Sequence, residues 1–192
     1  MLEWSSIFST DIELVDTQHQ RLFDMVNEVT EEINQGQESE KVFDEALDNL
    51  IAYSEQHFTD EELLMTKHKL DEKYLALHRM EHHSFVYDVN HMRSQLAIDN
   101  ELTERFEKLV LFVTNWLIYH TLRMDQLMAI QMKAIEAGKT PAQAYEIAQQ
   151  TTPNPQVTKL ILDALIHLWG EAIGRIHHLE TLLAQQQPKP GS

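Results

Sequence analysis

Two pairs of side chains in this sequence could bind a metal ion, because their spacing matches the turn of a helix. His57 precedes Glu61 by four residues, and His78 precedes His82 by four. Residues four apart on an α-helix lie on the same face, so both members of each pair would point in one direction. Imidazole and carboxylate groups aligned in this way can hold a metal between facing helices.

A third pair departs from this spacing. His120 and Asp125 are five residues apart, and on a regular α-helix the second side chain would point roughly 140° away from the first. A local π-helical turn would restore the alignment, and such turns are frequent at functional sites. His19, which comes before these pairs along the chain, would supply a further ligand.

The composition limits the chemistry to nitrogen and oxygen ligands, because the 192 residues include no cysteine. This excludes a thiolate zinc site, an iron–sulfur cluster, a disulfide framework and a cysteine nucleophile. Lys and Arg number 15 against 31 Asp and Glu, which gives a formal charge of −16. Such a charge opposes binding to phosphate backbones and to anionic lipid, so we expect no nucleic-acid partner.

Long helices must position these side chains, because residues 12–138 contain almost no helix-breaking residues. The connections between the expected helices are short, and Ile98, Asp99 and Asn100 join the last two. Short connections between long amphipathic helices favour an antiparallel four-helix bundle, so we expect an all-α fold. Apolar periodicity predicts helices from about Asp16 to Gly36, from Ser39 toward Leu64, from about Glu72 to Leu96 and from about Leu102 to Ala137.

The character of the chain changes after Gly138. Thr140 can cap a short helix that begins with a proline, and a proline-containing stretch then interrupts it. The charged residues after Gly138 balance, so the whole net charge falls on residues 1–138. We expect residues 1–138 to form an acidic bundle and residues 139–192 to form a C-terminal helical extension.

The extension carries apolar residues at alternating spacings of three and four, which is the pattern of a coiled-coil seam. This pattern predicts a helix that forms a homodimer and passes a signal onward. Additional apolar residues widen the same helix, so it could instead pack back on the bundle. Both interpretations remain open from the sequence. The seam residues are Leu162, Leu165, Trp169, Ala172, Ile176, Leu179 and Leu183.

Nothing in the sequence is typical of secretion or of a membrane span. The first four residues lack both a basic segment and an apolar run. The longest apolar stretch, residues 157–174, is interrupted by charged and histidine side chains and is too short for a bilayer core. We therefore expect a cytoplasmic protein without a membrane span.

At these residues the chain resembles the hemerythrin family, specifically bacterial hemerythrins. The resemblance covers about residues 1–135 and includes every ligand position of the family in order. Asp11 departs from it, because bacterial relatives usually have glycine there. The matching residues are Trp4, Phe8, Val15, Asp16, Gln18 and His19; Tyr53, His57, Phe58, Glu61, Glu62 and Met65; His78, His82 and Phe85; and Trp116, Leu117, His120 and Asp125.

The resemblance implies a centre of two irons joined by an oxo or hydroxo bridge. One iron with two histidines would keep an open position, and there the resemblance places reversible binding of dioxygen. A dry lining is expected from Phe58, Trp116, Leu117 and Met124, whereas Glu62 is expected to be a solvated neighbour of Glu61. The implied ligands are His78, His82 and His120 for one iron, His19 and His57 for the other, and Glu61 and Asp125 as bridges.

We therefore predict an oxygen or redox sensor module that is not itself an enzyme. Bacterial hemerythrin domains are often joined to output modules such as diguanylate cyclases or chemotaxis receptors, so a downstream output domain is a possible partner. An oxygen carrier or store is the nearest alternative. A di-iron peroxidase, nitric oxide reductase or ferroxidase is the alternative from another class. A ferritin-like site is disfavoured because no Glu in this sequence precedes a His by three residues. A zinc hydrolase is disfavoured because the sequence has no His-Glu-x-x-His motif.

Overall fold

The computed structural model describes residues 2–36, 39–99 and 101–186, with the side chains of 94–99, 178, 182 and 184–186 left aside. Within these residues the chain forms helices and no strands, which confirms the all-α prediction. The helices are η1 (Ser6–Phe8), α1 (Glu13–Asn34), α2 (Glu40–Lys67), α3 (Glu72–Asp99), α4 (Leu102–Tyr119), the π-helix η2 (His120–Asp125), α5 (Gln126–Glu136), α6 (Pro141–Gln150) and α7 (Pro155–Gln186).

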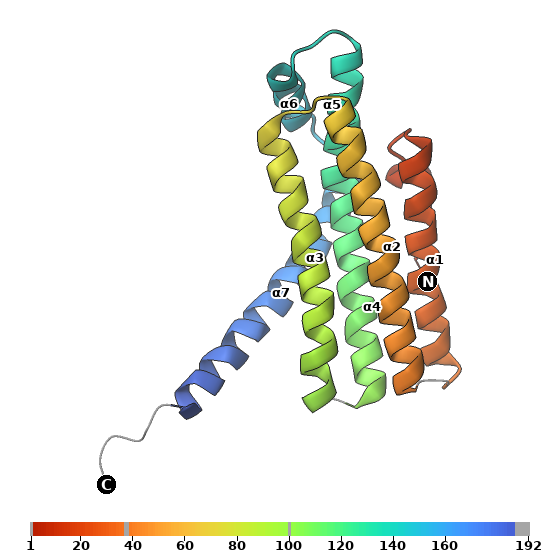
Figure 1. The fold of residues 1–192 in the computed structure, drawn as a ribbon, viewed down its shortest axis with the longest axis vertical. Helices are drawn as coiled ribbons and strands as arrows, with labels where there is room; N and C mark the ends of the chain where they lie inside the picture. The colour runs from red at the N-terminus through yellow and green to blue at the C-terminus, as the bar shows by residue number, and fades with distance from the viewer. Residues whose placement is uncertain (1, 37–38, 100, 187–192) are drawn as a thin grey trace.

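Four long helices run alternately up and down along one axis (Figure 1). α1 packs against α2 and α4, and α3 packs against the same two helices, so the four close into a bundle. α4 continues through η2 into α5 without a break, and together they form the single fourth helix expected from the sequence. The antiparallel four-helix bundle is therefore confirmed.

Helix ends follow their local capping signals. The Ser39 hydroxyl accepts a hydrogen bond from the Val42 amide at 3.2 Å and caps α2, as predicted. Thr140 and Gln143 form a reciprocal capping box at the start of α6. Gly36 follows α1 with a φ of 64°, a left-handed conformation that glycine adopts without strain.

Two predicted boundaries differ from the structure. α1 begins at Glu13 and not near Asp16, because Ile12 takes an extended conformation and the helix starts directly after it. α3 continues through Asp99, so Ile98 and Asp99 are helical and do not form the connection that we expected. Asn100 lies outside the described residues. Both differences lengthen helices that already carry the candidate ligands.

Aromatic packing fixes the relative positions of the bundle helices. The rings of Phe43 and Phe106 meet edge to face across α2 and α4, with centroids 4.9 Å apart. Phe85 of α3 packs against Phe112 of α4 at 6.1 Å. These side chains are buried, and burying one such side chain contributes about 1.5–3 kcal/mol.

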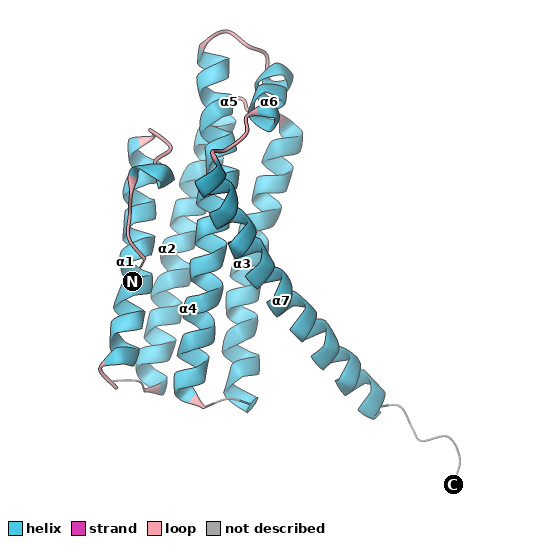
Figure 2. Cartoon of the chain, turned by 180° about the vertical axis from the view of Figure 1, so that it is seen from behind, coloured by secondary structure: helices cyan, strands magenta, loops and turns pink. Residues whose placement is uncertain are grey.

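The last two helices lie outside the bundle. α6 packs against α5 at one end, while α7 crosses α4 and then runs away from the bundle (Figure 2). Val157 and Ile161 at the start of α7 are buried in the same core cluster as Leu122 of η2. The start of α7 therefore packs on the bundle. Among the described residues, no helix is both long and apolar enough to span a membrane.

Candidate metal centre

The side chains expected to bind metal come together at one buried point inside the bundle. Each of the four long helices contributes at least one of them, and none is more than 1% exposed. They lie between two apolar core clusters, so water is excluded on both sides along the bundle axis. The contributors are His19 from α1, His57 and Glu61 from α2, His78 and His82 from α3, and His120 and Asp125 from η2.

Glu61 lies between two groups of imidazoles. Its Oε2 is 3.2 Å from Nε2 of His82 and 3.4 Å from Nε2 of His78. On the other side, Nε2 of His57 is 3.7 Å from the same oxygen. Ligand atoms of Glu61, His19 and His57 also lie within 4.8 Å of one another. A carboxylate in this position can contact metal ions on both sides.

Asp125 occupies a matching position. Its Oδ1 is 3.2 Å from Nε2 of His120 and 3.3 Å from Nε2 of His78. Its second oxygen, Oδ2, is 3.2 Å from Nε2 of His19. Each oxygen of Asp125 therefore faces a different group of histidines, which is the arrangement that a bridging carboxylate requires.

The nitrogens of one group are spaced as ligands around a common metal would be. Nε2 of His120 is 3.1 Å from Nε2 of His78 and 3.2 Å from Nε2 of His82. Two nitrogens at right angles around a metal, with bonds of roughly 2.1 Å, lie about 3 Å apart. The distances among these imidazoles therefore fit a shared metal ion.

Many polar atoms at this point have no hydrogen-bond partner among the described residues. Both carboxylate oxygens of Glu61 and of Asp125 lack one, as do both ring nitrogens of His19. A buried carboxylate without a partner is strongly unfavourable. Because these atoms point at neighbouring imidazole nitrogens, bound cations would satisfy them, and the donor set therefore fits a metal centre.

η2 aligns His120 with Asp125. The six residues from His120 to Asp125 form a π-helix, with regular α-helix before and after it. The π-helical turn that the five-residue spacing predicts is therefore present. It brings Oδ1 of Asp125 within 3.2 Å of Nε2 of His120.

The electrostatics of the site keep most of its imidazoles neutral. Burial lowers the pKa of His57 well below its usual range and that of His120 to about 4. Burial and the charge of Asp125 raise the pKa of Glu61 to about 7. Burial opposes charge on His78, but the carboxylates of Asp125 and Glu61 beside its Nε2 raise its pKa to about 9. The metal-free site thus holds protons that a bound cation would displace.

Gln18 orients His57. Nδ1 of His57 lies 3.0 Å from Oε1 of Gln18, an oxygen that can only accept, so the ring donates from Nδ1. The amide of Gln18 in turn donates to Oδ2 of Asp60 at 2.7 Å. This chain leaves Nε2 of His57 without a proton and directed toward Glu61.

Tyr74 orients His78 in a similar way. Its hydroxyl donates to the backbone carbonyl of Met124 at 2.6 Å. The hydroxyl has only one hydrogen, so it accepts its second hydrogen bond, which Nδ1 of His78 donates at 2.7 Å. Tyr74 is fully buried, so these two bonds are made without competition from water. The sequence analysis missed this residue, although its spacing of four from His78 places both on one helix face.

Glu62 corrects one expectation. It was expected to be a solvated neighbour of Glu61, but its side chain turns back toward α3 and is only 27% exposed. Its Oε1 lies 3.4 Å from Nδ1 of His82, and its Oε2 accepts from Nε of Arg79 at 2.9 Å. Glu62 therefore holds His82 from outside the centre.

Aromatic rings cover the imidazoles. Phe58 stacks on His82 with centroids 3.9 Å apart, and Trp116 stacks on His120 at 4.2 Å. Both contacts agree with the predicted lining. Trp4, from the N-terminal segment, adds a third ring 6.2 Å from His19. Leu117 and Met124 are also buried, with Met124 in the core cluster on the side of α5.

The N-terminal segment is held over the site by Asp16. This carboxylate accepts hydrogen bonds from the hydroxyl of Ser9 and from the amide and hydroxyl of Thr10. Asp11 follows with a φ of 63°, a left-handed conformation that glycine adopts most readily. Its side chain is bound by Lys133 at 2.7 Å, so the departure at Asp11 removes no ligand.

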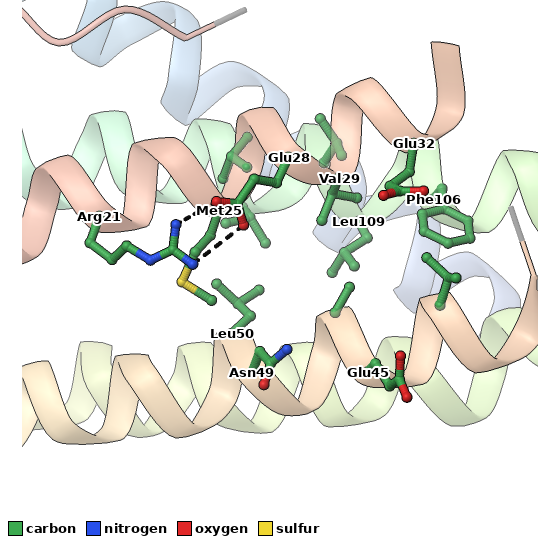
Figure 3. Close-up of a pocket in the computed structure, with 15 residues that line it drawn as sticks. Arg21, Met25, Glu28, Val29, Glu32, Glu45, Asn49, Leu50, Phe106 and Leu109 are labelled. Atoms are coloured by element: carbon green, nitrogen blue, oxygen red, sulfur yellow. Dashed lines mark hydrogen bonds and ion pairs between the residues drawn. The ribbon is translucent and has the colours of Figure 1, made fainter. Parts of the chain in front are cut away.

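A pocket of about 260 Å³ opens elsewhere, between α1, α2 and α4 (Figure 3). Met25, Leu50 and Leu109 supply part of its apolar lining, and an ion pair between Arg21 and Glu28 spans its edge. None of the metal-centre side chains lines it. This pocket is therefore separate from the candidate centre.

Residues 10–129 match the family described as the hemerythrin HHE cation binding domain. The match covers more than half of the chain. The chain belongs to the hemerythrin family. Its membership agrees with the resemblance noted in the sequence, and every side chain at the candidate centre lies inside the matched residues. The hemerythrin match ends before α6 and α7 begin.

Three similar proteins carry the name bacteriohemerythrin. The protein of Methylococcus capsulatus is 31% identical over 132 residues, which cover 66% of this chain and 93% of that protein. The protein of Clostridium acetobutylicum is 27% identical over 129 residues, covering 66% and 97%. The protein of Stenotrophomonas maltophilia is 25% identical over 134 residues, covering 70% and 83%. The chain therefore matches most of each of these hemerythrins and has about a third of its own length beyond the match.

Proposed function

We propose that this protein holds two iron ions in the bundle and binds dioxygen reversibly there. The observation that carries the proposal is the position of Glu61 and Asp125, each lying between two groups of imidazoles with both oxygens unpartnered. The proposed ligands are His78, His82 and His120 for one iron, His19 and His57 for the other, and Glu61 and Asp125 as bridges.

The donor set supports iron. Imidazole nitrogens with a minority of carboxylates suit iron, and a centre between facing helices is a common way to hold two irons in a bundle. Iron would supply the redox chemistry that binding of dioxygen requires. The iron bound by His19 and His57 would have fewer protein ligands than the other, so we assign the open position to that side.

The surrounding residues support reversible binding over turnover. Gln18 and Tyr74 hold the rings of His57 and His78 through Nδ1, which directs Nε2 of each ring inward. The rings of Phe58 and Trp116 cover the imidazoles of His82 and His120 and shield them from water. A dry, imidazole-rich site delivers few protons, and we therefore propose that the chain itself is not an enzyme.

We further propose that oxygen binding serves as a signal and that α7 transmits it. The support is that α7 packs against the π-helix that carries two ligands, and that Leu122 of this π-helix shares one buried core cluster with Val157 and Ile161 of α7. In this proposal residues 1–138 form the sensing domain and 139–192 the extension, which pairs with a second copy and leads toward an output domain. We place the protein in the cytoplasm. An oxygen carrier or store would need no such extension.

Oxygen titration tests the binding proposal. Protein reduced under anaerobic conditions should develop a charge-transfer band when oxygen is admitted, and the band should disappear when oxygen is removed, over repeated cycles. An immediate and irreversible oxidation would contradict reversible binding. Steady turnover of peroxide, nitric oxide or ferrous iron, abolished in His120→Ala, would favour the enzyme alternative.

Hydrogen exchange separates sensor from carrier. The amides of α7 should exchange at different rates in the reduced and the oxygenated protein, because the start of this helix packs on the π-helix of the site. The amides of α6, which packs on α5, provide the internal comparison. Identical exchange throughout α7 in the two states would favour the carrier.

A further inference from the structure

α7 has two apolar faces, and the bundle covers one of them. Val157, Ile161 and Ala164 are buried against the bundle. The seam predicted from the sequence is centred roughly 80° around the helix from this face. On the seam, Trp169 is 70% exposed and Leu183 is 62% exposed. The two interpretations that the sequence left open therefore apply to different faces of the same helix.

The C-terminal half of α7 has little support from its own chain. Arg175 still binds Asp88 of α3 at 2.8 Å, but the helix projects away from the bundle in both views (Figures 1 and 2). Gly170 and Gly174 lie within it, and each lowers helix stability by about 1 kcal/mol relative to alanine. In proteins most of the stability of a helix comes from packing of its apolar face, so an apolar partner would stabilise this half of α7.

We propose that the seam pairs with α7 of a second copy of this chain, in a parallel and in-register coiled coil. The heptad places Leu162, Trp169, Ile176 and Leu183 at a positions and Leu165, Ala172 and Leu179 at d positions. Such a seam is self-complementary, because each a or d side chain meets its own equivalent across a two-fold axis. This inference deepens the proposed pairing of α7 by giving its orientation and its register.

Charge fixes the orientation. In this heptad Arg175 is at a g position and Glu180 is at the e position five residues later. In a parallel, in-register pair, a g residue faces the e residue of the next heptad on the other helix, so Arg175 would meet Glu180 of the second copy, twice by symmetry. An antiparallel pair would place g beside g and e beside e, and the two charges would not meet.

Single cysteines test the orientation, because the chain has no cysteine of its own. Leu162 at an a position and Leu179 at a d position are both exposed and are separated by about 26 Å of helix. Under mild oxidation, Leu162→Cys and Leu179→Cys should each cross-link to themselves. Thr181→Cys, on the outer face of α7, should not. Cross-linking only when the two variants are mixed would show an antiparallel pair and overturn the proposal.

Light scattering tests the pairing itself. The unaltered protein should have twice the mass of one chain, and Ile176→Glu should reduce it to that of one chain. His177→Glu, on the exposed neighbouring position, is the matched control and should remain a dimer. A monomeric unaltered protein would overturn the proposal, whether α7 is free or covered by another protein in the cell.

Charge exchange tests the register. Glu180→Arg and Arg175→Glu should each weaken the dimer, by roughly 2–10-fold in Kd, and the double variant should restore it. Asp88→Asn removes the contact of Arg175 within the chain and should leave the dimer unchanged. No restoration in the double variant would contradict the register. Iron content measured on the same samples distinguishes failure of the seam from failure of the metal centre, since the seam contains none of its ligands.

Discussion

Nε2 of His120 lies 3.2 Å from Oδ1 of Asp125 although five residues separate them along one helix. This is possible because the chain from His120 to Asp125 is a π-helix, which accommodates one more residue per turn than the α-helix around it. In a regular α-helix the same two side chains would point roughly 140° apart. The π-helix therefore lets a single helix contribute two groups to the centre.

Removing one residue from the π-helix should preserve the centre. Arg123 is partly exposed and contributes no side chain to the site, and its deletion would leave His120 and the aspartate four apart on a regular α-helix. We expect the deletion variant to retain its iron. Deletion of Leu111, an exposed residue of regular α4, should instead rotate part of the helix and abolish iron binding. Metal analysis after anaerobic reconstitution measures the iron content of both deletion variants. Loss of iron from the Arg123 deletion variant would contradict the view that the π-helix contains one residue more than a regular α-helix needs there.

Adjacent glutamates should differ sharply in their effect on iron. Glu61→Ala removes a carboxylate that lies between both groups of imidazoles, so we expect the protein to lose iron from both positions. Glu62→Ala removes only a contact to Nδ1 of His82, and such outer contacts change metal affinity by about 10–100-fold. Iron per chain after desalting measures the first effect and competition with a chelator the second. Equal iron content in the two variants would contradict the assignment.

Tyr74→Phe should destabilise the protein even without metal. The change leaves Nδ1 of His78 and the carbonyl of Met124 buried without their partner, at a cost of about 1–3 kcal/mol. Urea unfolding of the metal-free protein measures this loss. Tyr87→Phe is the control, because Tyr87 is exposed and its removal should change stability by less than about 0.5 kcal/mol.

Metal binding should release protons and strengthen with pH. The pKa of His78 is raised from 6.5 to about 9 and that of Glu61 from 4.5 to about 7, so near neutral pH the metal-free site carries protons that metal must displace. Between pH 7 and 9 the affinity for ferrous iron should rise up to about tenfold per pH unit for one displaced proton. In the metal-free protein the raised pKa of His78 stabilises the fold below pH 6.5, and this stabilisation is lost as the pH rises through about 9. Anaerobic titration in weak buffer measures affinity and proton release together, and an affinity independent of pH would contradict the prediction.

The bundle and the convergence of its polar side chains could be predicted because both depend on spacing within single helices. His57 with Glu61, and His78 with His82, share a helix face whatever the rest of the fold does. The contact of Glu62 with His82 could not be predicted in this way, because it depends on how α2 and α3 are rotated toward each other. The path of α7 was likewise open, since two apolar faces on one helix do not say which one meets the bundle.

X-ray diffraction from crystals of the iron-loaded protein, with anomalous data collected at the iron absorption edge, tests the central claim most directly. Two anomalous peaks are predicted inside the bundle. One should lie within bonding distance of Nε2 of His78, His82 and His120, the other within bonding distance of His19 and His57, and oxygens of Glu61 and Asp125 should contact both. A single peak, or iron bound away from these side chains, would contradict the account.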